Sequence, residues 1–270
     1  MPKTKSIFAN QLALITGPTE GIGLDLAHLF AKEKCDLVLV SRDLGKLQKL
    51  QSELQKQYNI KATVFSYDLS LLESANQLIA DLERQSLQID ILINNAGFGV
   101  YGAFGDSPLE PQLGMLELHI NSPMKLAYAF LPGMRKRKRG GVLNVGSTAG
   151  FQPVPLQSVY GASKAFTLQF TEGLAEELHD SGVRVTCLCP GPTDTPFFSK
   201  EHMRKRGPAT RIRMPSKEVA EYGLAAFKAY QVVAIPGWTN RAITIGVRLA
   251  PRSAVRKAAR KVVESLPKVQ

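Results

Sequence analysis

A glycine-rich segment near the N-terminus constrains the fold of this chain more than any other feature. An apolar run over residues 12–15 leads into the sequence T-G-P-T-E-G-I-G over residues 16–23, and apolar residues at helical spacing follow. This order predicts a strand, a tight turn and a helix whose N-terminal N–H groups favour a phosphate. Gly17 would permit the turn, Gly21 a close approach of backbone to pyrophosphate, and Gly23 close packing of the helix on the strand.

Strands and helices are predicted to alternate along most of the chain, as they do in a parallel sheet. With 270 residues, 44% of them hydrophobic, the chain can bury the core of one α/β domain. We expect a Rossmann-type, doubly wound parallel sheet of about seven strands, with helices on both faces and a ligand at the carboxyl ends of the strands. Predicted strands span residues 12–15, 36–41, 62–67, 89–93, 141–145, 183–189 and 232–235, and predicted helices span residues 22–34, 44–58, 72–85, 111–136, 156–180 and 217–230.

A serine, a tyrosine and a lysine form a candidate proton-transfer site. Tyr160 follows Ser147 by thirteen residues, and Lys164 follows Tyr160 by four. In a helix, Lys164 would lie one turn beyond Tyr160 on the same face. A free tyrosine ionises near pH ~10, and a nearby positive charge stabilises its anion and so lowers its pKa. Taken alone, the spacing also fits a helix with a buried tyrosine and an exposed lysine.

Three further motifs fall where predicted elements end. Small residues and amides that suit a cofactor ribose follow the strand at 89–93. An asparagine precedes a proline that obstructs regular helix hydrogen bonding, and a proline–glycine turn with two threonines follows the strand at 183–189. These residues are Asn94, Asn95, Ala96 and Gly97; Asn121 before Pro123; and Pro190, Gly191, Thr193 and Thr195.

Together these motifs resemble the short-chain dehydrogenase/reductase family, from about residue 11 to about residue 236. That family carries T-G-x-x-x-G-x-G, N-N-A-G, a helix asparagine, a serine, Y-x-x-x-K and a P-G turn, and this chain has all of them in that order. The sequence around Tyr160 and the long basic C-terminus look closest to bacterial 3-oxoacyl and hydroxysteroid-type reductases.

The resemblance implies a role for each matching residue. Tyr160 would be the general acid in carbonyl reduction and the base in alcohol oxidation, and Ser147 would hydrogen-bond the substrate oxygen. Lys164 would lower the tyrosine pKa and hold the nicotinamide ribose, and Asn121 would anchor a water that relays protons to Lys164. Alternatively, Asn121 would satisfy backbone groups at a helix kink. The cofactor-binding residues implied are Gly17, Thr19, Gly21, Ile22, Gly23, Arg42, Asp68, Asn94, Ala96, Gly97, Tyr160, Lys164, Pro190, Gly191, Thr193 and Thr195.

The end of the second predicted strand bears on the choice of cofactor. An acidic residue there would bind the adenosine 2′-hydroxyl, whereas Ser41 followed by Arg42 leaves room and charge for a 2′-phosphate, which favours NADP(H). Alternatively, Arg42 is a surface residue beside Asp43, the N-cap of the next helix. Glu20 stands where many NADP-dependent relatives carry a basic residue, so NAD(H) stays an alternative. Asp68 matches the family position that bonds the adenine amine.

The net charge of +11 is concentrated near the C-terminus. Residues 1–199 hold 18 basic and 19 acidic residues, whereas residues 200–270 hold 16 basic and 4 acidic residues. One basic group falls on a predicted substrate lid at 195–215, within a catalytic domain at 1–246. The other falls on an extension at 247–270, for which we expect an amphipathic helix after Pro251. This extension would pack its apolar face on the domain, or bind an anionic membrane or an acyl carrier.

The activity predicted is NADP(H)-dependent interconversion of a carbonyl and a secondary alcohol. A dinucleotide-binding regulator, or a membrane-surface protein that retains the fold, is the alternative.

We also expect a homodimer or homotetramer that pairs through the helices at 111–136 and 156–180. The lack of aromatic residues among the charges argues against nucleic acid. The three cysteines lack metal-ligand spacing, so no metal site is expected. The sequence shows no signal-peptide pattern, so we expect a cytoplasmic protein or a peripheral membrane protein. An apolar substrate is expected from Phe98, Val100, Phe104, Phe151, Val154, Pro155, Phe197 and Phe198.

Overall fold

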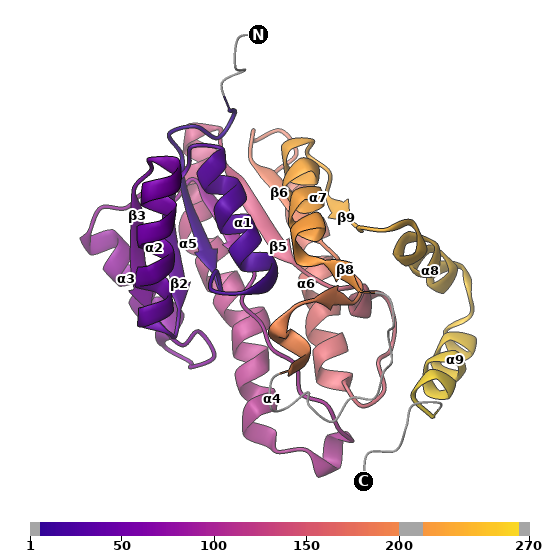
Figure 1. The fold of residues 1–270 in the computed structure, drawn as a ribbon. Helices are drawn as coiled ribbons and strands as arrows, with labels where there is room; N and C mark the ends of the chain where they lie inside the picture. Colours follow the sequence, from indigo (N-terminus) through magenta and orange to yellow (C-terminus); the bar gives the residue numbers. More distant parts are fainter. Residues whose placement is uncertain (1–5, 200–212, 265–270) are drawn as a thin grey trace.

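The computed structural model describes residues 6–199 and 213–264 and contains a parallel sheet with helices on both faces (Figure 1). Its strands are β1 (Leu12–Thr16), β2 (Asp36–Ser41), β3 (Ala62–Ser66), β4 (Ile91–Asn94), β5 (Gly141–Val145), β6 (Arg184–Leu188) and β9 (Val233–Ala234). They are ordered β3-β2-β1-β4-β5-β6-β9, and neighbouring strands run parallel. The predicted seven-stranded, doubly wound sheet is confirmed. Because the strand order reverses between β1 and β4, a crevice forms at their carboxyl ends.

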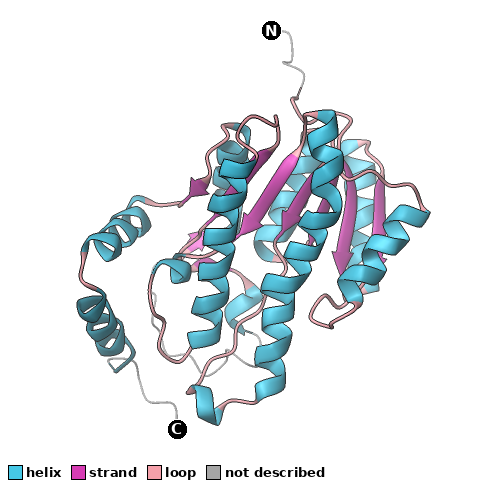
Figure 2. Ribbon diagram, turned by 180° about the vertical axis from the view of Figure 1, so that it is seen from behind, coloured by secondary structure: helices cyan, strands magenta, loops and turns pink. Residues whose placement is uncertain are grey.

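Two layers of helices bury the two faces of the sheet. On β1, Ile15 packs into the core beneath one layer and Leu14 into the core beneath the other, because successive side chains of a strand point to opposite faces. Figures 1 and 2 show these layers from opposite sides. One layer holds α1 (Gly21–Lys32), α2 (Leu44–Tyr58) and α7 (Ser216–Lys228), and the other holds α3 (Ser74–Arg84), α5 (Ser122–Arg137) and α6 (Ser158–Glu177).

The single helix predicted over residues 111–136 is wrong in detail. The structure has α4 (Leu109–Leu116), then a π-helical turn η2 (Glu117–Asn121), then α5. Pro123, in the first turn of α5, has no N–H to donate to the carbonyl four residues earlier, and a π-helical turn is one way in which a helix accommodates that loss. The interruption lies where the sequence predicted that the proline obstructs the helix.

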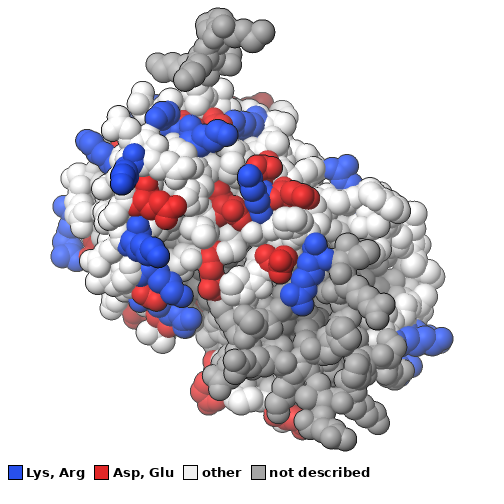
Figure 3. Space-filling model, viewed as in Figure 1, with Lys and Arg blue, Asp and Glu red and all other residues white. Residues whose placement is uncertain are grey.

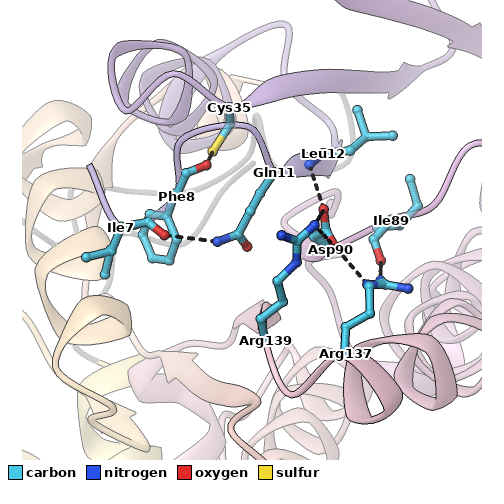
Figure 4. Close-up of polar contacts among 9 residues, drawn as sticks. All are labelled: Ile7, Phe8, Gln11, Leu12, Cys35, Ile89, Asp90, Arg137 and Arg139. Atoms are coloured by element: carbon cyan, nitrogen blue, oxygen red, sulfur yellow. Dashed lines mark hydrogen bonds and ion pairs between the residues drawn. The ribbon is translucent and has the colours of Figure 1, made fainter. Parts of the chain in front are cut away.

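A buried carboxylate ties the amino end of the sheet together (Figure 4). Asp90, which is 4% exposed, accepts the N–H of Leu12 at 3.2 Å and binds Arg137 at 3.0 Å and Arg139 at 3.3 Å. Two positive charges offset the cost of burying this carboxylate. Two arginines of the basic run at 135–139 therefore stabilise this end of the sheet.

Two helices follow β9 and form what we call the C-terminal arm, α8 (Trp238–Leu249) and α9 (Arg252–Glu264). The arm runs along the side of the molecule, beyond the edge strand of the sheet (Figures 1 and 2). The helix predicted after Pro251 is α9, whereas α8 was not predicted and crosses the predicted domain boundary at residue 246. Within the described ranges, no helix combines the length and apolarity that a bilayer-spanning segment needs.

The predicted substrate lid is only partly described. A two-residue parallel ladder joins β7 (Thr193–Asp194), just before the predicted lid, to β8 (Met214–Pro215), the lid's last two residues. Most of the basic residues predicted on the lid lie outside the described residues. These are Lys200, Arg204, Lys205, Arg206 and Arg211.

Candidate active site

A cavity of about 1000 Å³ opens at the carboxyl ends of the central strands. Most of the predicted site residues line it, although they come from segments far apart in the sequence. Three others, Gly23, Asn94 and Asn121, are not among the described residues that line it. The predicted residues in the lining are Gly17, Thr19, Gly21, Ile22, Arg42, Asp68, Ala96, Gly97, Ser147, Tyr160, Lys164, Pro190, Gly191, Thr193 and Thr195.

The glycine-rich turn between β1 and α1 forms one wall of the cavity. Gly17 and Gly21 have φ angles of +64° and +57°, which favour glycine. A Cβ atom on Gly23 would lie 2.2 Å from the carbonyl oxygen of Gly17, so this residue lets α1 pack against the turn. The exposed backbone and the N-terminus of α1 suit a pyrophosphate.

The two adjacent asparagines at the carboxyl end of β4 face different surroundings. Asn95, absent from the predicted site, donates through Nδ2 to the carbonyls of Thr16 at 3.0 Å and Gly17 at 2.9 Å, and so ties the turn to the loop after β4. Asn94 donates through Nδ2 to Asn144 Oδ1 at 2.8 Å inside the core, and its contact with the cofactor stays a prediction. Both belong to the N-N-A-G motif, and strand alternation separates them.

Lys164 and Tyr160 lie on the same face of α6, as their spacing predicted. The Lys164 Nζ donates to the carbonyl of Val145 at 2.9 Å and lies 5.9 Å from the centroid of the Tyr160 ring. Burial lowers the pKa of Lys164 to about 8, although Cys187 and Cys189 nearby act in the opposite direction. Ser147 lines the same cavity and accepts the N–H of Ala149 at 3.1 Å, at the start of the short helix η3 (Thr148–Phe151).

Asn121 lies on the π-helical turn η2. Its Nδ2 donates to Glu117 Oε2 at 2.6 Å, and Glu117 Oε1 accepts from Lys125 at 3.1 Å. The predicted water relay from Asn121 to Lys164 stays a prediction. His119 of the same turn contacts Tyr160 and was not predicted; its only signal in the sequence is its position two residues before Asn121.

The end of β2 brings three polar side chains into the cavity wall. Arg42 Nη1 lies 3.5 Å from Asp68 Oδ2, and Asp43 caps α2 by accepting the N–H of Lys46 at 3.0 Å. Partial burial raises the pKa of Asp68, but hydrogen bonds from Ser70 and the charge of Arg42 outweigh it, so the net shift is downward. The two interpretations of this segment are therefore compatible: Asp43 is an N-cap and Arg42 lines the cavity.

Two features here match an adenosine 2′-phosphate. Among the described atoms, the buried Ser41 Oγ has no hydrogen-bond partner. Lys46, which was not predicted, adds a second cation to the lining besides Arg42. A hydroxyl and two cations at the end of β2 fit a phosphate group.

The opposite end of the cavity is apolar. Of the aromatic and aliphatic residues predicted there, Phe98, Val154, Pro155 and Phe197 line it, whereas Phe104 is 61% exposed. The side chain of Phe198 lies outside the described residues. The C-terminal arm provides the remaining wall through Ile243, Gly246, Val247, Ala250, Ala254, Val255, Ala258, Ala259 and Val262.

The fold and this cavity define a Rossmann-type oxidoreductase with a dinucleotide site. Residues 11–206 match the family model described as short chain dehydrogenase, and the chain belongs to that family. No group of three or more His, Cys, Asp or Glu residues suited to a metal occurs in the described part of the chain.

Known relatives and solved structures agree with this assignment. The chain is 29% identical over 261 residues to a very-long-chain 3-oxoacyl-CoA reductase of Homo sapiens, covering 92% of this chain and 83% of the relative. A short-chain dehydrogenase from Sphingobium yanoikuyae, solved with NADPH, superposes with a TM-score of 0.79 at 29% identity, covering 96% and 98% of the two chains. A bulky-bulky ketone specific alcohol dehydrogenase from Comamonas testosteroni gives a TM-score of 0.75 at 27% identity, covering 96% of each chain.

Proposed function

We propose that this protein is an NADP(H)-dependent reductase that interconverts a carbonyl and a secondary alcohol on an apolar substrate. The observation that carries the proposal is that Ser147, Tyr160 and Lys164 line the same cavity as the glycine-rich turn. A dinucleotide-binding regulator would need none of these three side chains.

The residues divide the chemistry between them. NADPH, when bound along the glycine-rich turn, supplies the hydride. Tyr160 donates a proton to the substrate oxygen, and Ser147 hydrogen-bonds that oxygen. Lys164, held by the carbonyl of Val145, favours the tyrosinate that remains after proton transfer.

The apolar end of the cavity supports a large hydrophobic ketone or a 3-oxoacyl thioester as the substrate. Phe197 packs against Tyr160 with ring centroids 5.9 Å apart, so the apolar wall begins beside the proposed acid. The names of the human and Comamonas relatives, a very-long-chain 3-oxoacyl-CoA reductase and a bulky-bulky ketone specific enzyme, point in the same direction.

Loss of NADPH absorbance with a panel of small ketones, bulky ketones and 3-oxoacyl thioesters tests the proposal. We expect turnover of at least one apolar carbonyl. Tyr160→Phe should reduce kcat at least ~10³-fold and leave NADPH binding intact, because it removes the proton donor and keeps the ring. Near-parental turnover by this variant would exclude Tyr160 as the acid.

Two further assignments belong to the proposal. We propose a homodimer or homotetramer through α5 and α6, where Tyr128 of α5 is 83% exposed. A cytoplasmic location is proposed from the buried, unpaired cysteines Cys35, Cys187 and Cys189. Binding of the arm to an anionic membrane or an acyl carrier is the weaker proposal, because the apolar face of its most basic helix, α9, lines the cavity.

A further inference from the structure

His119 lies against the proposed catalytic tyrosine but not in the cavity lining. It is 4% exposed, and its ring contacts Tyr160 edge-on, with centroids 5.8 Å apart and planes at 72°. It also occupies the space beside Gly97, where a Cβ atom would lie 2.8 Å from His119 Nε2. This histidine therefore sits between the loop after β4 and helix α6.

The hydrogen bonds of His119 fix where its proton resides. Nε2 accepts the backbone N–H of Phe98 at 3.3 Å, so Nε2 carries no proton. Nδ1 lies 2.9 Å from Ser163 Oγ, and that hydroxyl already donates to the carbonyl of Tyr160 at 2.8 Å. The proton in the hydrogen bond between His119 and Ser163 must therefore come from Nδ1–H. The ring is neutral and in the Nδ1–H tautomer. Burial, with a smaller contribution from Lys164, also holds the pKa of His119 well below its usual value.

These bonds form one continuous relay with a single direction. It runs from the Phe98 N–H to His119, from His119 to Ser163, and from Ser163 to the backbone of Tyr160. One end belongs to the loop whose Ala96 and Gly97 line the dinucleotide side of the cavity, and the other to the helical turn that carries the proposed acid. A shift of about 1 Å at such a site can cost ~10²-fold in rate.

We infer that His119 is a positioning residue, which sets the place of Tyr160 relative to the cofactor-side loop through Ser163. The kinetic test of this inference rests on the proposed function. His119→Phe keeps the ring edge and removes both hydrogen bonds, whereas His119→Asn retains a donor near the Nδ1 position. We expect kcat to fall about tenfold in His119→Phe and to stay within about threefold of the parent in His119→Asn, with NADPH affinity little changed in both.

A double variant and a matched control separate positioning from packing. In a Ser163→Ala background, His119→Phe should cause little further loss of kcat, because the two residues act through one relay. Thr171→Val is the control: Thr171 is also fully buried on α6, accepts from Asn144 at 2.9 Å, and has no part in the relay. It should lower the melting temperature without lowering kcat. If His119→Phe behaves like this control, His119 is only a core residue.

A spectroscopic measurement tests this hydrogen-bond relay and needs no activity assay. Long-range proton–nitrogen NMR of the full chain with labelled histidine should show one neutral, buried imidazole as the Nδ1–H tautomer, and His119→Phe should remove that signal. An Nε2–H tautomer or an imidazolium at neutral pH would overturn the inference. If the parent reduces no carbonyl, the proposed function fails, while the tautomer result still stands or falls by itself.

Discussion

At the residue scale, Arg42 offers a direct test of cofactor choice. It shares the end of β2 with the unpartnered Ser41 Oγ, and Lys46 lies in the same wall. Arg42→Ala should weaken NADPH binding by about 1.5 to 3 kcal/mol, the range for hydrogen bonds to charged groups, and barely change NADH binding. Titration of both cofactors into both proteins measures this, with Arg135→Ala as a surface control. Equal losses for NADPH and NADH would mean that Arg42 does not contact the 2′-phosphate.

Lys164 links the site to the pH dependence of stability. Its pKa in the folded, cofactor-free protein is about 8, below the usual 10.5, because it is buried. Between these two pH values Lys164 is protonated in the unfolded chain and neutral in the folded one. The free energy of unfolding therefore rises with pH across this range. Relative to Lys164→Met, the parent should therefore become more stable from pH ~8 to pH ~10, by on the order of 3 kcal/mol at most.

Denaturant unfolding of both proteins across that range provides the measurement. Other titrating groups are shared by the two chains, so the difference isolates Lys164. A constant difference with pH would show that Lys164 keeps an ordinary pKa.

Individual residues also show where sequence reasoning reaches its limit. The spacing of Tyr160 and Lys164 fixed their common helix face, because helical periodicity is local. Asn94 and Asn95 were harder to separate, since only the register of β4 beside β1 and β5 turns one inward and the other toward the glycine turn. The role of His119 depends on a contact with Ser163, 44 residues away, which no local pattern reveals.

At the element scale, the main sheet was predictable and its interruptions were not. Apolar runs bounded by turn residues predicted every strand of the parallel sheet to within two residues at each end. The π-helical turn η2 and the ladder of β7 with β8 have no such signature, because each depends on packing around it. Helix α8 was not predicted. Three of its apolar residues, Ile243, Ile245 and Leu249, are more than half exposed, so the helix buries little apolar surface on the sheet domain.

The C-terminal arm should control the size of substrate that the enzyme accepts. Ala258 of α9 lines the same cavity as Val154 and Pro155. Ala258→Trp would fill that space, so KM for a bulky ketone should rise about tenfold, the scale of losing an apolar contact in a pocket. The kcat/KM for a small ketone should stay within about twofold, because its reaction needs only the space near Tyr160.

Lys257→Trp is the matched control for this experiment. Lys257 adjoins Ala258 on the same helix but is exposed and absent from the described cavity lining. The control should leave both ketones unaffected. Equal effects of the two tryptophans would show that the arm does not border the substrate.

At the scale of the whole molecule, the distribution of charge bears on whether the protein binds a membrane surface. The arm carries seven basic residues and one acidic residue between positions 238 and 264, and Trp238 and Leu249 are 80% and 82% exposed. Figure 3 shows that, among the described residues on the face in view, basic and acidic side chains are interspersed. The apolar face of the basic helix α9 lines the cavity, so the apolar residues left for lipid are those of α8, namely Trp238, Ile245 and Leu249.

We therefore expect the full chain to stay in the supernatant when it is centrifuged with anionic or neutral vesicles at ~0.1 M salt. Each Lys or Arg near an anionic surface contributes about 1 kcal/mol, and raising the salt to ~1 M shortens the Debye length from ~10 Å to ~3 Å. Pelleting with anionic vesicles alone, lost at high salt, would contradict this expectation. Charge reversal on α9, with Arg252, Arg256, Lys257 and Lys261 changed to Glu, would then show whether the arm is responsible, since these changes leave the cavity-lining residues in place.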